Sequence, residues 1–201
     1  MTNSPPFAAL NLRRNPFGEL TRDEWTSAAV LDVERWVEPL SQPGFALQLL
    51  APKGRGKTTH LLALAQRLGG STYHRATRGP LPTGGDLLLL DEADSLWFWE
   101  RRKAAHRWRS LAFSSHRDLS LEFRCWGFRV QTHRVSASSL TQLERIVDRR
   151  IALAEYTGSP APRPEPYHLK SLHQRYGDNV RTIFDELYEH YQQLAREHVQ
   201  M

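Results

Sequence analysis

The sequence is poor in cysteine and in long hydrophobic runs, and each absence excludes a class of protein. Its 201 residues include one cysteine, Cys125, so an internal disulfide framework and a cysteine-based zinc site are both excluded. No apolar run approaches the length of a membrane span, and the N-terminus lacks the charged and then apolar pattern of a signal peptide. The nine histidines show no metal-ligand spacing. We therefore expect a cytoplasmic protein that has no membrane segment.

The composition suits one folded domain, or one domain with a small appendage. Hydrophobic residues make up 40% of the chain, which is enough for a substantial core. Lys and Arg number 27 against 22 Asp and Glu, which gives a formal net charge of +5. This excess permits anionic partners such as nucleic acid, but it does not demonstrate one.

A glycine-rich motif follows the apolar run at 45–50. Residues 51–58 read Ala-Pro-Lys-Gly-Arg-Gly-Lys-Thr, which is typical of a phosphate-binding loop except that Ala51 stands where the first glycine is usual. Gly54 and Gly56 let backbone N–H groups turn toward phosphate oxygens, and the helix that follows points its positive end at them. The alternative is an ordinary glycine-rich turn. The order of strand, turn and helix favours the phosphate loop.

This loop predicts ATP and Mg²⁺ as cofactors. Lys57 can reach the β- and γ-phosphates, and the Thr58 hydroxyl can bind Mg²⁺. The other predicted members of the phosphate site are Pro52, Lys53, Gly54, Arg55, Gly56 and Thr59.

A second motif lies at 87–92, where four leucines are followed by Asp91 and Glu92. Such an all-apolar run fits a strand that is buried on both faces of a parallel sheet. Asp91 can hold Mg²⁺ through water, and Glu92 can orient and deprotonate an attacking water. The alternative is a charged turn after a core strand. The phosphate loop nearby favours catalysis.

Strands and helices are predicted to alternate as far as residue 136. The predicted strands are 45–50, 71–76, 86–90, 111–116 and 128–133, and the predicted helices are 22–40, 57–68 and 94–110. This alternation predicts an α/β fold, namely a three-layer αβα core with a parallel sheet. We place an extended, Pro-rich arm at 1–20 and the core at 21–136.

The pattern becomes all-helical after residue 136. Ser139 and Gln142 have the spacing of a capping box, and apolar residues recur at helical spacing from there to residue 153. Further helices are predicted at 167–176 and 178–197. We therefore predict a small helical lid at 137–201.

These motifs, in this order, resemble the AAA+ class of P-loop ATPases over nearly the whole chain. The resemblance implies a five-stranded αβα core that is followed by a helical lid, and hydrolysis of ATP to ADP and phosphate. Within the class, the layout is most similar to small ATPases that assist DNA transposition.

The resemblance also implies roles for polar residues outside the two motifs. Ser115 matches a strand residue that senses the γ-phosphate, with His116 as the alternate. Arg181, at the end of the segment Gly-Asp-Asn-Val-Arg, matches a lid arginine that contacts the nucleotide. The alternatives are a polar strand end for Ser115 and a solvated helix arginine for Arg181.

Two further assignments from the resemblance concern the adenine base and a neighbouring subunit. The segment Asn-Pro-Phe is similar to one that lies beside the adenine ring, so Pro16 and Phe17 are expected to cover the base; alternatively, Phe17 anchors the arm on the core. Arg124 matches an arginine that completes the site of a neighbouring subunit, with Arg117 as second choice. Arg124 is alternatively a surface charge.

A cluster of tryptophans and basic residues follows the second motif. Its members are Trp97, Trp99, Arg101, Arg102, Lys103, Arg107, Trp108 and Arg109. Stacking aromatics among cations suit a nucleic-acid strand, and a tryptophan patch flanked by arginines suits a protein partner. The third alternative, which we favour, is a helix that packs its tryptophans on the sheet.

Together these features predict Mg²⁺-dependent ATP binding and hydrolysis that drives a conformational or assembly change in a partner complex. Such a change would move the lid against the core. The alternatives are a non-hydrolysing, nucleotide-dependent interaction switch and a P-loop small-molecule kinase. Glu92 argues against the switch, and the position of the helical segment after the last strand argues against the kinase.

Overall fold

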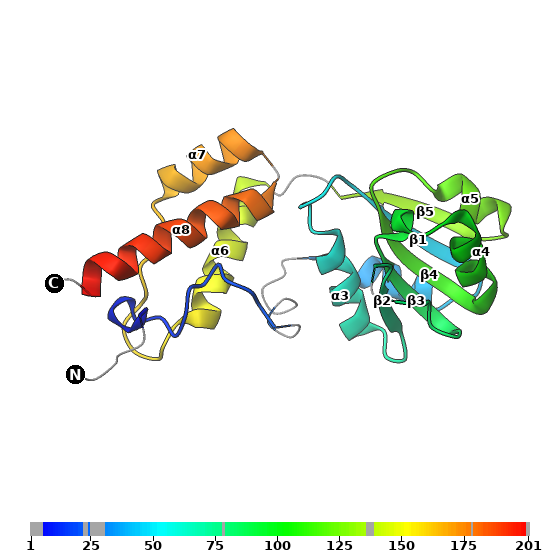
Figure 1. Ribbon diagram of the computed structural model, residues 1–201, viewed down its shortest axis with the longest axis horizontal. Helices are drawn as coiled ribbons and strands as arrows, with labels where there is room; N and C mark the ends of the chain where they lie inside the picture. The colour runs from blue at the N-terminus through cyan, green and yellow to red at the C-terminus, as the bar shows by residue number, and fades with distance from the viewer. Residues whose placement is uncertain are drawn as a thin grey trace. The chain divides into compact units, whose positions relative to one another are not determined.

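The chain folds as two compact units in the computed structural model (Figure 1). The described residues are 6–21, 24, 31–77, 79–135, 139–177 and 179–199. One unit is Leu31–Ser136, and the other combines Met1–Val30 with Ala137–Met201. The N-terminal segment therefore groups with the C-terminal helices. The sequence places the start of the core at residue 21, whereas the division of the structure falls after Val30.

The unit Leu31–Ser136 is built on a parallel sheet of five strands in the order β2-β3-β4-β1-β5. The strands are β1 (Phe45–Leu50), β2 (Thr72–Arg75), β3 (Gly85–Asp91), β4 (Trp108–Ser115) and β5 (Arg129–Arg134). Every residue of β1 is buried, as expected for a strand in the middle of a sheet with both faces covered. The predicted α/β fold with a parallel sheet is confirmed.

Helices cover both faces of this sheet (Figure 1). The helices α2 (Val37–Leu40) and α3 (Lys57–Arg67) lie on one face, and α4 (Phe98–Arg107) and α5 (Ser120–Cys125) lie on the other. Successive residues of a strand point to opposite faces, so β1 contributes side chains to the hydrophobic core on each face of the sheet. Leu47 packs with Leu61 of α3, whereas Ala46 packs in the cluster that contains Phe123 of α5.

The predicted helix at 94–110 is wrong at both ends. Its first residues form a short 3-10 helix, Ala93–Ser95, and its last residues, from Trp108, belong to β4. Trp108 is buried against Gly85 of β3, where a Cβ atom would lie 2.7 Å from the indole ring. Trp108 therefore pairs with β3 beside a glycine that leaves room for its indole ring. This pairing outweighs the helical pattern of the sequence around it.

The predicted helix at 22–40 can be judged only at its end, because residues 22–23 and 25–30 lie outside the described residues. There the chain forms a 3-10 helix, Glu34–Trp36, followed by α2. Trp36 and Leu40 are buried against the sheet, so the predicted apolar face is present on a shorter element.

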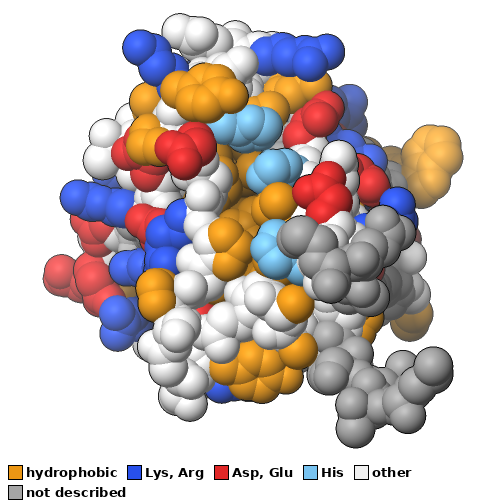
Figure 2. Space-filling model, turned by 90° about the vertical axis from the view of Figure 1, so that its left-hand side faces the viewer, with side chains coloured by type: hydrophobic (Ala, Val, Ile, Leu, Met, Phe, Trp, Pro, Cys, Tyr) orange, Lys and Arg blue, Asp and Glu red, His pale blue; other side chains and the backbone are white. Residues whose placement is uncertain are grey.

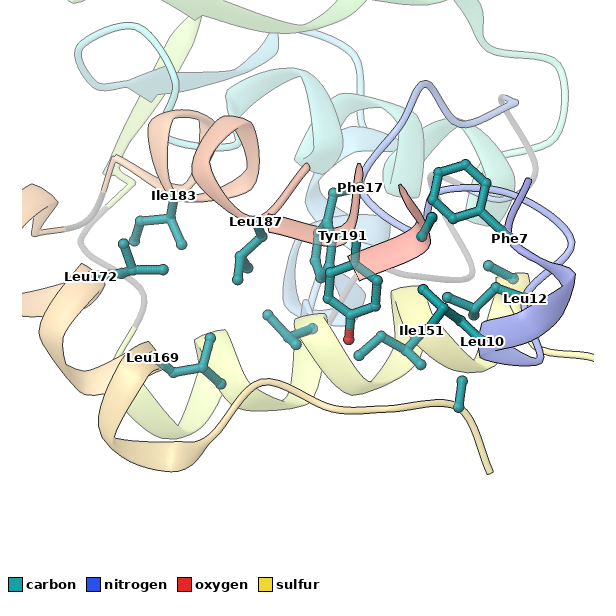
Figure 3. Close-up of a cluster of buried hydrophobic side chains, with 14 of the residues drawn as sticks. Phe7, Leu10, Leu12, Phe17, Ile151, Leu169, Leu172, Ile183, Leu187 and Tyr191 are labelled. Atoms are coloured by element: carbon teal, nitrogen blue, oxygen red, sulfur yellow. The ribbon is translucent and has the colours of Figure 1, made fainter. Parts of the chain in front are cut away.

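The second unit contains three long helices, α6 (Leu140–Ala154), α7 (Pro166–Tyr176) and α8 (Val180–Val199). Ser139 caps α6, because its hydroxyl accepts a hydrogen bond from the Gln142 amide at 3.1 Å. Residues of the N-terminal segment complete the core of this unit (Figure 3). Leu12 and Phe17 pack there with Tyr191 of α8.

Histidines contribute to the surface of the helical unit. The rings of His168 and His190 stack with their centroids 5.4 Å apart, and burial lowers the pKa of His190. In the view of Figure 2, histidine side chains gather among hydrophobic and acidic ones. Within the described part of the chain, no group of three or more His, Cys, Asp or Glu residues could hold a metal ion. None of the helices described here, α8 included, is long and apolar enough to cross a membrane.

Candidate active site

The glycine-rich loop joins β1 to α3, as the sequence predicts. Gly54 has a φ of 83° and Gly56 a φ of 82°, which are left-handed values that favour glycine. Ala51 has no positive φ, and its amide donates to the Ser115 carbonyl at 3.3 Å. The position that departs from the usual motif is therefore an extension of β1 along β4. Alanine fits there without strain.

Lys57 is buried at the start of α3 and turns its ammonium group back onto the loop. Nζ donates to the carbonyl oxygens of Ala51 at 2.7 Å and Pro52 at 2.8 Å. Burial lowers the pKa of Lys57, and the charges of three nearby carboxylates, chiefly Asp91, oppose that effect. The ammonium group thus spans the loop that would bind phosphate. A phosphate oxygen would replace the carbonyl oxygens as its acceptor.

Asp91 lies buried at the carboxyl end of β3 and receives three hydroxyl groups. Thr58 Oγ1 donates to its Oδ2 at 2.8 Å, and the Tyr73 hydroxyl donates to the same oxygen at 3.0 Å. Ser114 of β4 donates to Oδ1. The structure therefore brings together Thr58 and Asp91, the predicted metal ligands. Both offer the hard oxygen atoms that Mg²⁺ prefers, and phosphate and water would have to supply the rest of its shell.

Glu92 follows Asp91 in a strained backbone conformation, with φ 60° and ψ 45°. Non-glycine residues in this region are uncommon and often lie at functional sites. The Glu92 amide donates to Ser114 Oγ at 2.8 Å. That bond fixes the turn at the end of β3 against the neighbouring strand.

The Glu92 carboxylate is held by Arg75 at the end of β2. Arg75 Nε donates to Oε2 at 3.1 Å and Nη2 donates to Oε1 at 2.7 Å, so the pair is bidentate. These hydrogen bonds lower the pKa of Glu92, and partial burial opposes them. Glu92 is therefore an ionised carboxylate near neutral pH, as a general base requires. In this conformation both of its oxygens contact Arg75.

Three residues of this site, Tyr73, Arg75 and Ser114, were missed by the sequence analysis. Each lies near the carboxyl end of β2 or β4, and these strands flank β3 in the sheet. A polar residue near the end of a predicted strand was the available signal. The sequence does not give the strand order, so it could not show that these ends meet Asp91 and Glu92.

Ser115, the predicted γ-phosphate sensor, points away from Asp91. It is buried, and its hydroxyl accepts a hydrogen bond from Gln48 Nε2 at 2.8 Å. Ser114 makes the contact to Asp91 instead, because adjacent strand residues face opposite sides. His116, the alternate, places Nδ1 2.9 Å from Asp94 Oδ2. A sensor role for Ser115 stays a prediction.

The three arginines predicted to contact a nucleotide from the lid or from a neighbouring subunit all lie at exposed positions. Arg124 is in the last turn of α5, and Arg117 lies in the loop before that helix. Arg181 is near the start of α8 in the helical unit, and Asp178 of its motif lies outside the described residues. Their roles toward the nucleotide stay predictions.

Pro16 and Phe17, which are predicted beside the adenine, are buried within the helical unit. The Phe17 ring lies 5.6 Å from that of Phe184 and 5.3 Å from that of Tyr191. Arg150 also contacts this segment, and its Nε donates to the Pro16 carbonyl at 2.9 Å. Burial lowers the pKa of Arg150 to about 10. Phe17 thus anchors the N-terminal segment on the helices rather than on the sheet, while contact with adenine stays a prediction.

The tryptophan and arginine cluster does not behave as one helix face. Trp108 is buried, whereas 80% of Trp97 and 64% of Trp99 are exposed, so core packing holds for only one of these three. Arg101 is also buried and forms a bidentate ion pair with Glu122 of α5. Its predicted place in a nucleic-acid surface is therefore wrong, because its guanidinium ties two helices together.

No protein-family model and no curated protein sequence matches this chain. Solved structures do match it. The ORC1 protein of Aeropyrum pernix, in complex with DNA, has a TM-score of 0.61 at 16% identity, and the match covers 96% of this chain and 65% of that one. Domain III of the replication initiation protein DnaA from Thermotoga maritima has a TM-score of 0.54 at 16% identity, with coverage of 84% and 87%.

A point mutant of RuvB from Thermotoga maritima has a TM-score of 0.52 at 16% identity, and the match covers 87% of this chain and 65% of that one. The chain thus spans slightly less than two thirds of the ORC1 and RuvB chains. These neighbours are AAA+ P-loop ATPases, and the chain has their fold.

Proposed function

We propose that this protein binds ATP with Mg²⁺ and hydrolyses it to ADP and phosphate. One observation carries the proposal: Lys57, Thr58, Asp91 and Glu92 come from two separate motifs and lie together at the carboxyl ends of β1 and β3. Binding sites in open parallel sheets lie outside the carboxyl ends of the strands. The AAA+ fold supports the proposal, although at 16% identity it establishes only the architecture.

The glycine loop and Lys57 would bind the phosphates. Gly54 and Gly56 shape the loop, and the first amides of α3 have no partner within the helix, so they are available to phosphate oxygens. Thr58 and Asp91 would hold Mg²⁺. When bound, the ion would offset negative charge that develops on the phosphate oxygens.

Glu92 would accept a proton from the attacking water. Its lowered pKa keeps it ionised, and Ser114 holds its backbone in place. Because Arg75 occupies both carboxylate oxygens, hydrolysis requires that this ion pair loosen or that water enter beside it. We propose that nucleotide binding produces this change.

Hydrolysis would act on a partner complex through the exposed arginines. Arg181 would report the nucleotide state to the helical unit, and Ser115 would sense the γ-phosphate. In an assembly, Arg124 or Arg117 would complete the site of a neighbouring subunit. These roles follow from the AAA+ resemblance and are supported by the exposure of all three arginines.

The second candidate function is a nucleotide-dependent switch that does not hydrolyse ATP. The bidentate bond between Arg75 and Glu92 favours it, because the arginine occupies a lone pair on each carboxylate oxygen and so opposes the approach of an attacking water to Glu92. The two functions share the nucleotide site and differ only in whether phosphate is released.

Nucleotide binding and phosphate release by the full chain, with and without Mg²⁺, test the proposal. We expect the wild type to bind a fluorescent ATP analogue and to release phosphate, and Lys57→Ala to lose most of both. Arg67→Ala is the matched control, because it removes an exposed cation from the last turn of the same helix. The absence of nucleotide binding in the wild type would contradict both candidate functions. Nucleotide binding without phosphate release would support the non-hydrolysing switch and contradict the ATPase.

A further inference from the structure

Three consecutive aromatic side chains are exposed at the start of α4. Trp97 is 80% exposed, Phe98 41% and Trp99 64%, and the few other large exposed hydrophobic residues of the described chain are scattered. A single exposed aromatic residue needs no explanation, but a contiguous group marks a binding surface. None of the contacts within the proposed ATP site uses these residues.

The aromatic side chains have defined positions. Phe98 lies edge-on to Trp99 at 5.1 Å and to Trp126, which follows α5, at 5.3 Å. Trp97 and Phe98 also line a surface pocket of about 340 Å³ together with Arg117. Trp97 and Phe98 thus border a hollow that Asp94, Ser95, Leu96 and Arg101 also line, while Trp99 lies outside it on the exposed surface.

Exposed cations adjoin these rings. Trp99, Arg102, Lys103 and His106 share the outer face of α4, because residues three and four apart in a helix are neighbours. The Arg102 guanidinium lies 5.9 Å from the Trp99 ring centroid. With Arg117 on the pocket wall, positive charge flanks the aromatic residues.

Four carboxylates lie in this region, and each makes at least one polar contact within the protein, although Asp94 Oδ1 has no hydrogen-bond partner. Glu122 pairs with Arg101, Glu100 accepts from the Trp97 amide at 2.9 Å, and Asp94 accepts from the His116 amide at 3.3 Å. Asp118 likewise accepts from the Ser120 amide at 2.8 Å. Arg102, Lys103 and Arg117 form no ion pair with the described residues, so they are the cations of the patch that can contact phosphate groups.

We propose that this aromatic–basic patch, formed by Trp97, Phe98, Trp99, Arg102, Lys103 and Arg117, binds single-stranded nucleic acid. Bases stack on the tryptophans, and the cations contact the phosphates. A duplex keeps its bases stacked on each other, so it cannot use the aromatic faces. The patch begins at Trp97, on the segment that leads from Glu92 into α4.

The test measures anisotropy of a fluorescein-labelled, mixed-sequence 20-nucleotide DNA strand with the full chain and without ATP. Because ATP is absent from the assay, its result does not depend on whether the protein hydrolyses ATP. We expect Trp97→Ala/Trp99→Ala to weaken binding by at least tenfold, since stacking contributes roughly that much per base. Tyr167→Ala removes an exposed ring from the helical unit and should bind as the wild type does. Thermal unfolding of each variant confirms that it is folded.

The salt dependence tests the charged part of the patch separately. For single strands, the slope of log K against log salt changes by about 0.7 for each phosphate contact. Arg102→Gln/Lys103→Gln should therefore flatten the slope by about 1.4. Arg67→Gln, an exposed cation on the opposite face of the sheet, should leave it unchanged.

Three results would overturn the proposal. The first is a wild type that does not bind the DNA strand, which would indicate that the patch binds a protein partner instead. The second is binding that the two tryptophan substitutions do not change. The third is equal affinity for the strand and its duplex, since this would mean charge attraction without stacking.

Discussion

At the scale of the residue, the site depends on a few groups whose neighbours fix their chemistry. Ala51 replaces a glycine without strain because the chain is extended there, whereas Gly56 is needed for its positive φ. Glu92 takes up a conformation that few non-glycine residues adopt, and Arg75 and Ser114 hold it there. The strained residue is the one that the proposed reaction requires as base.

Replacement of Arg75 by Gln should change the pH dependence of ATP hydrolysis. Arg75 lowers the pKa of Glu92, so its removal raises that pKa toward the ordinary value. The base works only when ionised. As the pH is lowered, the activity of Arg75→Gln should therefore begin to fall at a higher pH than the activity of the wild type.

The measurement is kcat/KM for ATP against pH, with Arg67→Gln as a control that removes an exposed cation outside the site. An unchanged acid limb in Arg75→Gln would contradict the assignment of Glu92 as base. A shift in the control as well would mean that overall charge, rather than this ion pair, is responsible.

The predicted site residues that the structure brings together are those in local motifs. Lys57 and Thr58 lie within one loop, and Asp91 and Glu92 lie at the end of one strand, so spacing along the chain was enough to find them. Their partners Tyr73 and Ser114 are distant in sequence, and only the strand order brings them together.

At the scale of the element, α4 shows how buried pairing can decide the role of a charged residue. Its sequence carries Arg101, Arg102 and Lys103 in a row, and the sequence alone does not separate their roles. In the structure Arg101 faces α5, while Arg102 and Lys103 face outward. Because of the helical period, Arg101 lies on the face that packs in the fold, whereas Arg102 and Lys103 lie on the face that can contact a ligand.

Replacement of Arg101 by Ala should destabilise the sheet unit by roughly 3 kcal/mol, because it leaves Glu122 without its partner. The change also removes a donor to the Leu96 carbonyl. Urea unfolding, followed by circular dichroism, measures the difference. Arg102→Ala should lower the free energy of unfolding by no more than about 0.5 kcal/mol, since that residue is exposed. Equal losses for the two variants would contradict a structural role for Arg101.

Element boundaries were predicted less well than element types. The five parallel strands and the C-terminal helices were expected, and β1, β3, β4 and the helices have clear apolar patterns, whereas β2 and β5 are largely polar. The end of α4 was missed because Trp108 and Arg109 continue a helical pattern, while their pairing with β3 is a tertiary effect.

At the scale of the whole molecule, the chain has separate hydrophobic cores in its two units. The N-terminal segment contributes Leu12 and Phe17 to the core of the helical unit. No periodic pattern in that Pro-rich segment predicts this, because its packing depends on contacts with α6 and α8 that are distant in sequence.

Replacement of Leu187 by Ala should destabilise the helical unit by about 3 kcal/mol, as expected for a fully buried leucine. Hydrogen exchange should then quicken in α6, α7, α8 and the segment around Leu12, while the sheet amides keep their protection. Leu49→Ala, in the core of the sheet unit, should give the reverse pattern. Unchanged exchange around Leu12 in Leu187→Ala would contradict the grouping of the N-terminal segment with the helices.

The most direct test of the proposed ATPase compares phosphate release by wild type and Glu92→Gln under saturating ATP and Mg²⁺, in the presence of the DNA strand. We expect Glu92→Gln to bind nucleotide as the wild type does, because the substitution leaves Lys57, Thr58 and Asp91 in place. Its phosphate release should fall by roughly 10²- to 10⁴-fold, the usual contribution of a general base. Equal rates in the two proteins, or no release by either, would contradict catalysis by Glu92.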